Sequence, residues 1–79
     1  MTDGERLQRI ERVFGSVFGR KVPFHSALKR ADEPRWSSLK HVEFIIALER
    51  EFSVRFDGAD ATDMTSIPAV LERVRQRCV

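Results

Sequence analysis

The stretch that decides the fold is residues 36–52, with the sequence WSSLKHVEFIIALEREF. Serine is a favoured N-cap, and no glycine or proline follows the two serines in this stretch. The sequence therefore predicts a helix that begins at Ser37 or Ser38 and ends near Phe52. At 100° per residue, one side of this helix is an apolar face suited to a core. The residues of that face are Phe44, Ile45, Leu48 and Phe52.

The same helix carries a second apolar stripe about 130° away, formed by Leu39, Val42 and Ile46. Glu43 and Arg50 are among the charged residues that flank it. A small domain needs only one apolar face per helix, so the second stripe has two interpretations. It contacts a partner protein, or the loop before the helix covers it.

Upstream, Thr2 and Glu5 have the T-x-x-E spacing of a capping box, which predicts a first helix that ends near Gly19. Its apolar residues recur at helical spacing, and they are Leu7, Ile10, Val13, Phe14, Val17 and Phe18. The opposite side is predicted to face solvent, and it carries Glu5, Arg9, Arg12 and Ser16.

Between the two helices, Pro23 and Pro34 interrupt any helical pattern, so residues 20–35 are predicted to form a long loop. One helical turn is expected near residues 26–30. Val22, Phe24 and Leu28 are the apolar residues expected to hold the loop to the rest of the domain.

Downstream, residues 53–57 are predicted to be extended, with Val54 and Phe56 pointing inward, and residues 59–64 to form a short helix. Ser66 is the expected cap of a last helix. Its apolar residues are Ile67, Val70, Leu71 and Val74, and Arg73, Arg75 and Arg77 follow near its C-terminal end, where the helix dipole favours cations. The chain thus reads as one all-α domain over residues 1–79, a small four-helix bundle with three main helices, a short third helix and a long loop after the first helix.

The composition fits a soluble, single-domain, cytoplasmic protein. Among 79 residues, 42% are hydrophobic and 33% are charged, and the net charge of +2 is too small to demand a nucleic-acid partner. The N-terminal residues lack the pattern of a signal peptide, and no apolar run approaches membrane-spanning length. His25, His41 and the single cysteine, Cys78, lack metal-ligand spacing, so no metal site is expected and Cys78 is interpreted as incidental.

Four groups of residues, Ser38-Leu39, Val42-Glu43, Leu48-Glu49 and Phe52, resemble the second helix of acyl carrier proteins and of the related peptidyl and aminoacyl carrier domains. The order of the predicted elements resembles that family over most of the chain. The resemblance implies an acyl-carrier-protein type of bundle and a monomer that is not an enzyme.

In that family, a phosphopantetheinyl transferase moves 4′-phosphopantetheine from coenzyme A to the serine before the leucine, which is Ser38 here. The resemblance implies that the arm carries an acyl or aminoacyl group as a thioester to loading and processing enzymes of a lipid, polyketide or other specialised pathway. Partner enzymes would contact the second helix through Leu39, Val42, Glu43 and Ile46.

Two features depart from the family pattern. Ser37 stands where the family usually has an aspartate, and Lys40 and His41 make the head of the helix more basic than in many carriers. Ser37 can still cap the helix, but the charge that the family uses to meet its transferase is lost. Either a tolerant transferase modifies Ser38 or the chain is a diverged carrier that is seldom modified, and the basic helix head favours a specialised pathway.

Other interpretations stay open. Ser38 could be a plain cap residue, and the chain could be an unmodified carrier-like module that binds a protein through its second helix. His41 lies one turn beyond Ser38, but without a third residue to orient a Ser-His dyad it is interpreted as packed or hydrogen-bonded. A basic nucleic-acid-binding domain is the weakest of the readings.

Overall fold

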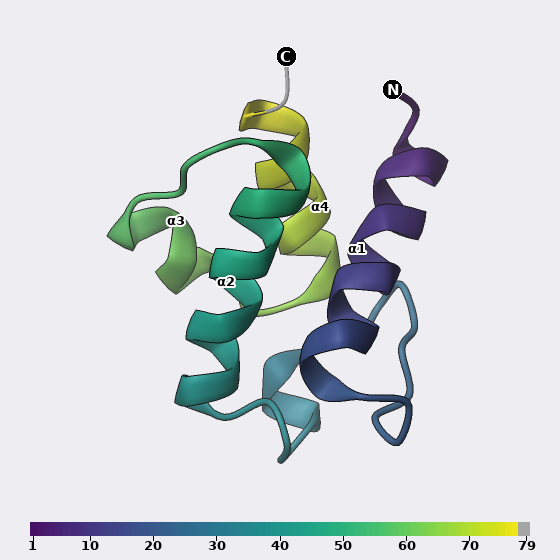
Figure 1. Cartoon of the computed structure of the whole chain (residues 1–79). Helices are drawn as coiled ribbons and strands as arrows, with labels where there is room; N and C mark the ends of the chain where they lie inside the picture. The colour runs from purple at the N-terminus through teal and green to yellow at the C-terminus, as the bar shows by residue number, and fades with distance from the viewer. Residues whose placement is uncertain (78–79) are drawn as a thin grey trace.

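The computed structural model of the chain describes residues 1–77, so Cys78 lies outside the described residues. Its helices are α1 (Asp3–Phe18), α2 (Ser38–Phe52), α3 (Gly58–Asp63) and α4 (Ile67–Arg77), with a 3₁₀ turn η1 (Arg30–Asp32) in the long loop (Figure 1). Within residues 1–77 the only β-type pairing is an isolated bridge between Lys29 and Ser66. The prediction of a small all-α bundle is confirmed.

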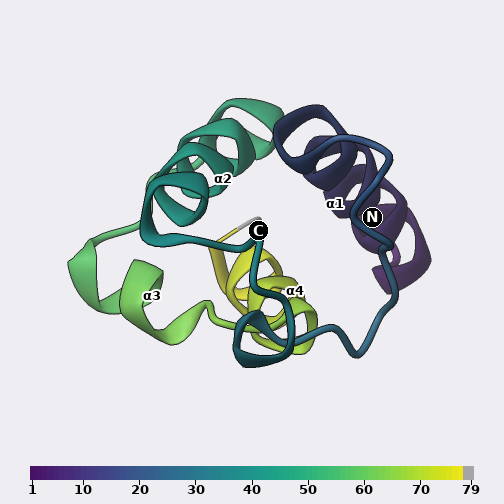
Figure 2. The same cartoon turned by 90° about the horizontal axis from the view of Figure 1, so that it is seen from below.

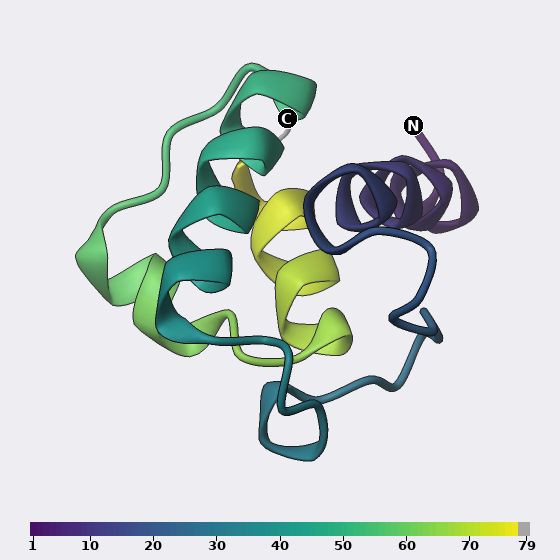
Figure 3. The same ribbon diagram turned by 60° about the horizontal axis from the view of Figure 1, so that its bottom comes forward.

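The helices enclose a single core. Seen along the bundle, α1, α2 and α4 surround it, and α3 lies beside α2 and α4 (Figure 2). Helix α1 runs antiparallel to α2, and the first turn of α1 lies at the same end of the bundle as the last turn of α4 (Figure 1). Two hydrogen bonds from Arg75 to the Asp3 carboxylate join these turns. The long loop passes the opposite end, where α2 and α4 begin (Figure 3).

Local capping explains where α1 begins and ends. Thr2 Oγ1 accepts a hydrogen bond from the Glu5 N–H, and the Glu5 carboxylate accepts one from the Thr2 N–H, which completes the predicted capping box. The helix ends at Gly19, whose φ of 80° favours a residue without a side chain.

One residue of the expected solvent side of α1 is placed differently. Arg9 was predicted to be exposed, but it is half-buried: its Nε donates to Glu51 at 2.7 Å, and its guanidinium lies 4.8 Å from the centre of the Phe52 ring. The end of α2 lies beside α1 at this point, which a single-helix wheel does not include.

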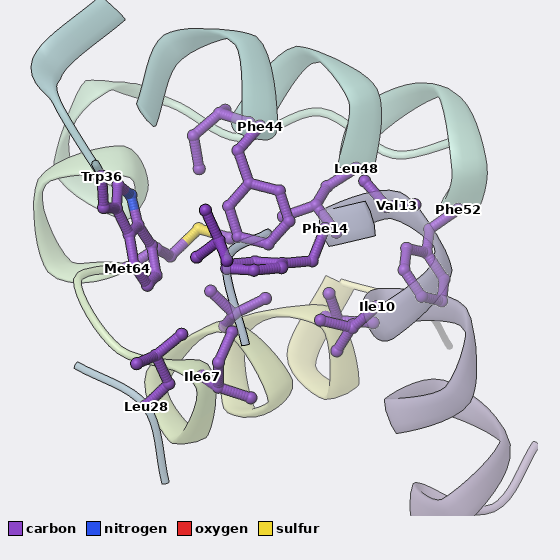
Figure 4. Packing of buried hydrophobic residues seen from close by; sticks show 14 residues of the cluster. Ile10, Val13, Phe14, Leu28, Trp36, Phe44, Leu48, Phe52, Met64 and Ile67 are labelled. Carbon is purple, nitrogen blue, oxygen red and sulfur yellow. The ribbon is translucent and has the colours of Figure 1, made fainter. Parts of the chain in front are cut away.

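The core is built around aromatic side chains (Figure 4). Phe14 of α1 meets Phe44 of α2 and Trp36 edge to face, with ring centres 5.7 Å and 6.0 Å apart. Met64, at the end of α3, and Ile67, at the start of α4, are fully buried. The whole predicted core face of α2 is buried, namely Phe44, Ile45, Leu48 and Phe52.

The long loop is held down by side chains, as expected. Val22 and Leu28 are buried, and Phe24 packs partly buried against the core. The 3₁₀ turn falls at Arg30–Asp32, later than the helical turn expected near residues 26–30. The reason is tertiary: the Leu28 carbonyl accepts from the Ile67 N–H at 2.8 Å, and the Arg30 N–H donates to the Thr65 carbonyl at 2.8 Å. These bonds flank Lys29, which is extended and pairs with Ser66 before α4, so the helical turn begins only at Arg30.

The segment after α2 follows the prediction. Val54 and Phe56 are partly buried against the core, and the short helix is present as α3. The Ser66 hydroxyl accepts from the Ala69 N–H at 3.2 Å, as expected of the cap of α4.

Ion pairs, in addition to the helix dipole, account for the arginines of α4. Asp60 of α3 is 2% exposed and accepts hydrogen bonds from Arg73 at 2.9 Å and from Arg77 at 2.7 Å. The hydrogen bond from Arg77 is the largest cause that lowers the pKa of the Asp60 carboxyl from its ordinary value, and the backbone N–H of Asp57 and the charge of Arg73 add to it. The two ion pairs of Asp60 join α3 to α4.

Candidate functional site

Ser37 and Ser38 have different roles at the start of α2. Ser37 is the N-cap, and its hydroxyl accepts the Lys40 N–H at 3.2 Å. Ser38 is the first residue of the helix and is exposed to solvent. The prediction that Ser37 caps the helix is confirmed. The Ser38 hydroxyl is left out of the capping and lies at the positive end of the helix dipole.

Arg30 holds the Ser38 hydroxyl from the side of the loop. Its Nη2 donates to Ser38 Oγ at 3.1 Å, and its Nε donates to the Trp36 carbonyl oxygen at 3.1 Å. Among residues 1–77, no carboxylate forms an ion pair with Arg30. A half-buried guanidinium with uncompensated charge therefore lies next to the exposed hydroxyl.

Sequence reasoning missed Arg30. The residue lies in an irregular loop, where no periodicity separates it from neighbouring basic residues such as Lys29. Its position depends on its own N–H, which is bonded to Thr65 far along the chain. The only available signal was its basic character in the loop that leads to the serines.

The loop segment between Arg30 and α2 is itself fixed by charge. The buried Glu33 carboxylate accepts from the backbone N–H of Arg35 at 2.9 Å and from its guanidinium at 3.1 Å. These bonds, with the backbone bond first, lower the pKa of the Glu33 carboxyl from its ordinary value. The Glu33 carbonyl also accepts a hydrogen bond from the Trp36 N–H. Residues 33–36 therefore form a hydrogen-bonded turn that places Trp36 in the core.

His41 does not hydrogen-bond to Ser38. Its Nδ1 accepts the Trp36 indole N–H at 3.0 Å, and its Nε2 lies 2.8 Å from the Ala61 carbonyl oxygen. Because a carbonyl only accepts, Nε2 carries the proton and both ring nitrogens are engaged. The residue is buried, which confirms the interpretation of a packed, hydrogen-bonded histidine. The arrangement fixes the first turn of α2 to Trp36 and to α3.

A hollow of about 270 Å³ opens beside Ser38, between the loop, α2 and α3. Its lining residues are Arg30, Ser38, His41, Val42, Ala61, Thr62 and Thr65. Within the described chain, the one side chain that hydrogen-bonds Ser38 Oγ is Arg30, which is a donor and not a base. The site thus offers an exposed hydroxyl and a cation, which suits the binding of an anionic group on Ser38.

The second stripe of α2 is open to solvent. Leu39 is 69% exposed, Val42 54% and Ile46 45%, so the interpretation that the long loop covers them is wrong. The loop passes instead across the end of the bundle (Figure 3). Its Val22 and Leu28 side chains are buried in the core. Besides Met1, these three are the large apolar side chains exposed within residues 1–77.

Lys40, at the head of α2, is turned toward α1. Lys40 Nζ donates to the Val17 carbonyl at 3.1 Å, where it meets the negative end of the α1 dipole. It also lies 3.3 Å from the exposed carboxylate of Glu43. The positive charge at the serines therefore comes from Arg30, because Lys40 is occupied elsewhere.

The described residues contain no cluster of three or more histidine, cysteine, aspartate or glutamate side chains that could hold a metal ion. None of the helices within residues 1–77 combines the length and the apolar character needed to cross a membrane. The chain matches no model of a known protein family and no curated protein.

Proposed function

We propose that this protein is a carrier of the acyl-carrier-protein type, with 4′-phosphopantetheine attached to Ser38. The observation that carries the proposal is the state of Ser38: an exposed hydroxyl on the first residue of α2, free of capping duty and contacted by the Arg30 guanidinium at 3.1 Å. The order of helices and the Ser38-Leu39 start of α2 support it through their resemblance to the family.

The residues around Ser38 suit a phosphodiester. Free N–H groups in the first turn of a helix and the helix dipole favour an anion there, and Arg30 adds a full positive charge. Arg30 is fixed by the Trp36 carbonyl, so little side-chain freedom is lost when it binds a phosphate oxygen. When bound, the arm supplies a thiol that holds an acyl or aminoacyl group as a thioester.

The chain in this proposal is a substrate of enzymes and not a catalyst. Its partners are a phosphopantetheinyl transferase and the loading and processing enzymes of a lipid, polyketide or other specialised pathway in the cytoplasm. Leu39, Val42, Glu43 and Ile46 form the surface offered to them, and all four are exposed on α2. The protein acts as a monomer.

The absence of the usual aspartate does not impair the helix. Ser37 makes the capping bond that an aspartate would make, so what is missing is the negative charge. With Arg30 beside it, the site is cationic, which calls for a transferase that tolerates such a surface.

A second candidate function is an unmodified helical module that binds a protein through α2. The observation that favours it is the exposure of Leu39, Val42 and Ile46, because this surface exists whether or not Ser38 is modified.

Incubation with several phosphopantetheinyl transferases and coenzyme A, followed by intact-mass spectrometry, separates the two functions. The carrier gains the mass of one phosphopantetheine group, and Ser38→Ala does not. Ser37→Ala is the matched control and still gains it. No mass gain with any of the transferases would leave only the interaction module.

A further inference from the structure

The exposed stripe of α2 lies between positively charged ends. We use the name docking face for Leu39, Val42 and Ile46, which are the exposed apolar side chains of α2. Three hollows adjoin this face, and two of them lie at its ends. Val42 lines the hollow beside Ser38, and Ile46 lines one of about 460 Å³ at the C-terminal end of the helix. Ile46 also lines the third, of about 490 Å³, between α2 and α1.

The carboxylates of α2 near the docking face are already engaged. Glu43 forms an ion pair with Lys40 at 3.3 Å. The Glu49 carboxylate accepts the Phe56 N–H at 2.8 Å, and Glu51 binds Arg9 at 2.7 Å. Glu43 and Glu51 are therefore paired with cations of the domain itself, whereas Glu49 is bound to a backbone N–H.

The arginines at the two ends of the docking face are not paired in this way. Arg50 and Arg55 are exposed and line the hollow beside Ile46, while Arg30 lines the hollow beside Val42. Within residues 1–77 none of these three arginines forms an ion pair with a carboxylate. Glu49 also lines the hollow beside Ile46, so the two arginines leave an excess of positive charge at that end of the apolar stripe. Arg30 adds a positive charge at the other end.

We infer that the docking face binds a protein whose own apolar patch is rimmed by aspartate and glutamate side chains. Burial of the three aliphatic side chains supplies affinity, and carboxylates opposite Arg50 and Arg55 supply orientation and faster association. This inference rests on the proposed function, which assigns partner binding to this surface of α2. What it adds is that the partner is acidic around its apolar patch.

The same features argue against other polyanions. Single-stranded nucleic acids are typically bound by a basic groove with exposed aromatic side chains for stacking, whereas Trp36 is buried and the docking face is aliphatic. A membrane surface favours an amphipathic helix free to insert its apolar face, whereas the larger apolar face of α2 is committed to the core.

The inference is tested with two synthetic helical peptides that share a leucine stripe and differ in their rim, which is glutamate in one and lysine in the other. The protein is ¹⁵N-labelled and carries Ser38→Ala, so the result does not depend on modification. The glutamate peptide is expected to bind at least about tenfold more tightly than the lysine peptide, with amide shifts centred on residues 39–46. Added salt should weaken the binding.

Charge reversal gives the matched comparison. Arg50→Glu with Arg55→Glu should weaken binding of the glutamate peptide at least about tenfold, because like charges then face each other. Arg20→Glu with Lys21→Glu makes the same change in net charge in the long loop, away from the three hollows, and should leave the affinity unchanged.

Equal affinity for the two peptides, or binding of neither, would overturn the inference. The inference would also be overturned if the protein bound vesicles of equal parts phosphatidylcholine and phosphatidylglycerol and the Arg50 and Arg55 reversal abolished that binding. The docking face would then bind a lipid surface. If the peptides behave as expected and Ser38 is never modified, the inference stands and the carrier function fails. If Ser38 is modified and the peptides do not discriminate, only the inference fails.

Discussion

The Arg30 guanidinium donates one hydrogen bond to the Ser38 hydroxyl and another to the Trp36 carbonyl, each 3.1 Å long. The two bonds join the long loop to the head of α2 and fix a positive charge at the one exposed hydroxyl of the first helical turn. Trp36 is in turn buried in the core and bonded to His41, so the charge is held by the packed part of the domain.

Phosphopantetheinylation should stabilise the wild-type fold by about 1 kcal/mol, because the new phosphodiester meets both the helix dipole and Arg30. In Arg30→Ala the gain should fall by about half or more, since only the dipole remains. The difference in urea unfolding free energy between modified and unmodified protein measures this. Lys29→Ala is the control, and an unchanged gain in Arg30→Ala would exclude a role of Arg30 toward the phosphate.

Ser37→Ala should lower the unfolding free energy by about 1 kcal/mol, because the N–H of Lys40 loses its acceptor. Ser37→Asp restores an acceptor and adds a favourable charge at the helix start, so its stability should equal or exceed that of the wild type. Chemical denaturation measures both variants. If Ser37→Ala unfolds at the wild-type urea concentration, the capping assignment is wrong.

The two faces of α2 should respond differently to the same substitution. Leu48→Ala removes a fully buried side chain and should cost about 2–5 kcal/mol, whereas Leu39→Ala removes an exposed one and should change stability by less than about 0.5 kcal/mol. Urea unfolding of both variants tests the assignment. Comparable losses would mean that Leu39 is covered in solution.

Acid should destabilise the domain through Asp60. Its folded-state pKa lies below the ordinary aspartate value, chiefly because of Arg77, so its stabilising contribution is fully present above that ordinary value. The contribution is lost as the pH falls from the ordinary value through the lowered folded-state pKa.

Asp60→Asn should be less stable than the wild type at pH 7 and should lose less additional stability between pH 5 and about pH 3, the range around the ordinary aspartate pKa. Denaturation midpoints across this range measure the difference. Parallel acid profiles of the two proteins would show that Asp60 does not carry the effect.

The helices were predictable because their signals are local. The Thr2 and Glu5 capping box, the serine caps and the spacing of apolar residues all lie within a few residues of the structure that they specify. The exposure of Leu39, Val42 and Ile46 could not be decided in this way, because it depended on the path of a loop without periodicity.

The contacts that the sequence did not reveal are long-range. Arg9 binds Glu51 across two helices, and Arg30 reaches Ser38 because its backbone is bonded to Thr65. Each contact requires the relative placement of elements, which neither capping nor helical periodicity contains. Asp60 likewise gave no sign in the sequence that it would be buried between Arg73 and Arg77.

Fragmentation mass spectrometry of the transferase-treated protein shows directly whether Ser38 carries the phosphopantetheine arm. We expect the added mass on Ser38 and an unmodified Ser37. Added mass on Ser37 or on any other residue, or unmodified protein after treatment with several transferases, would contradict this expectation.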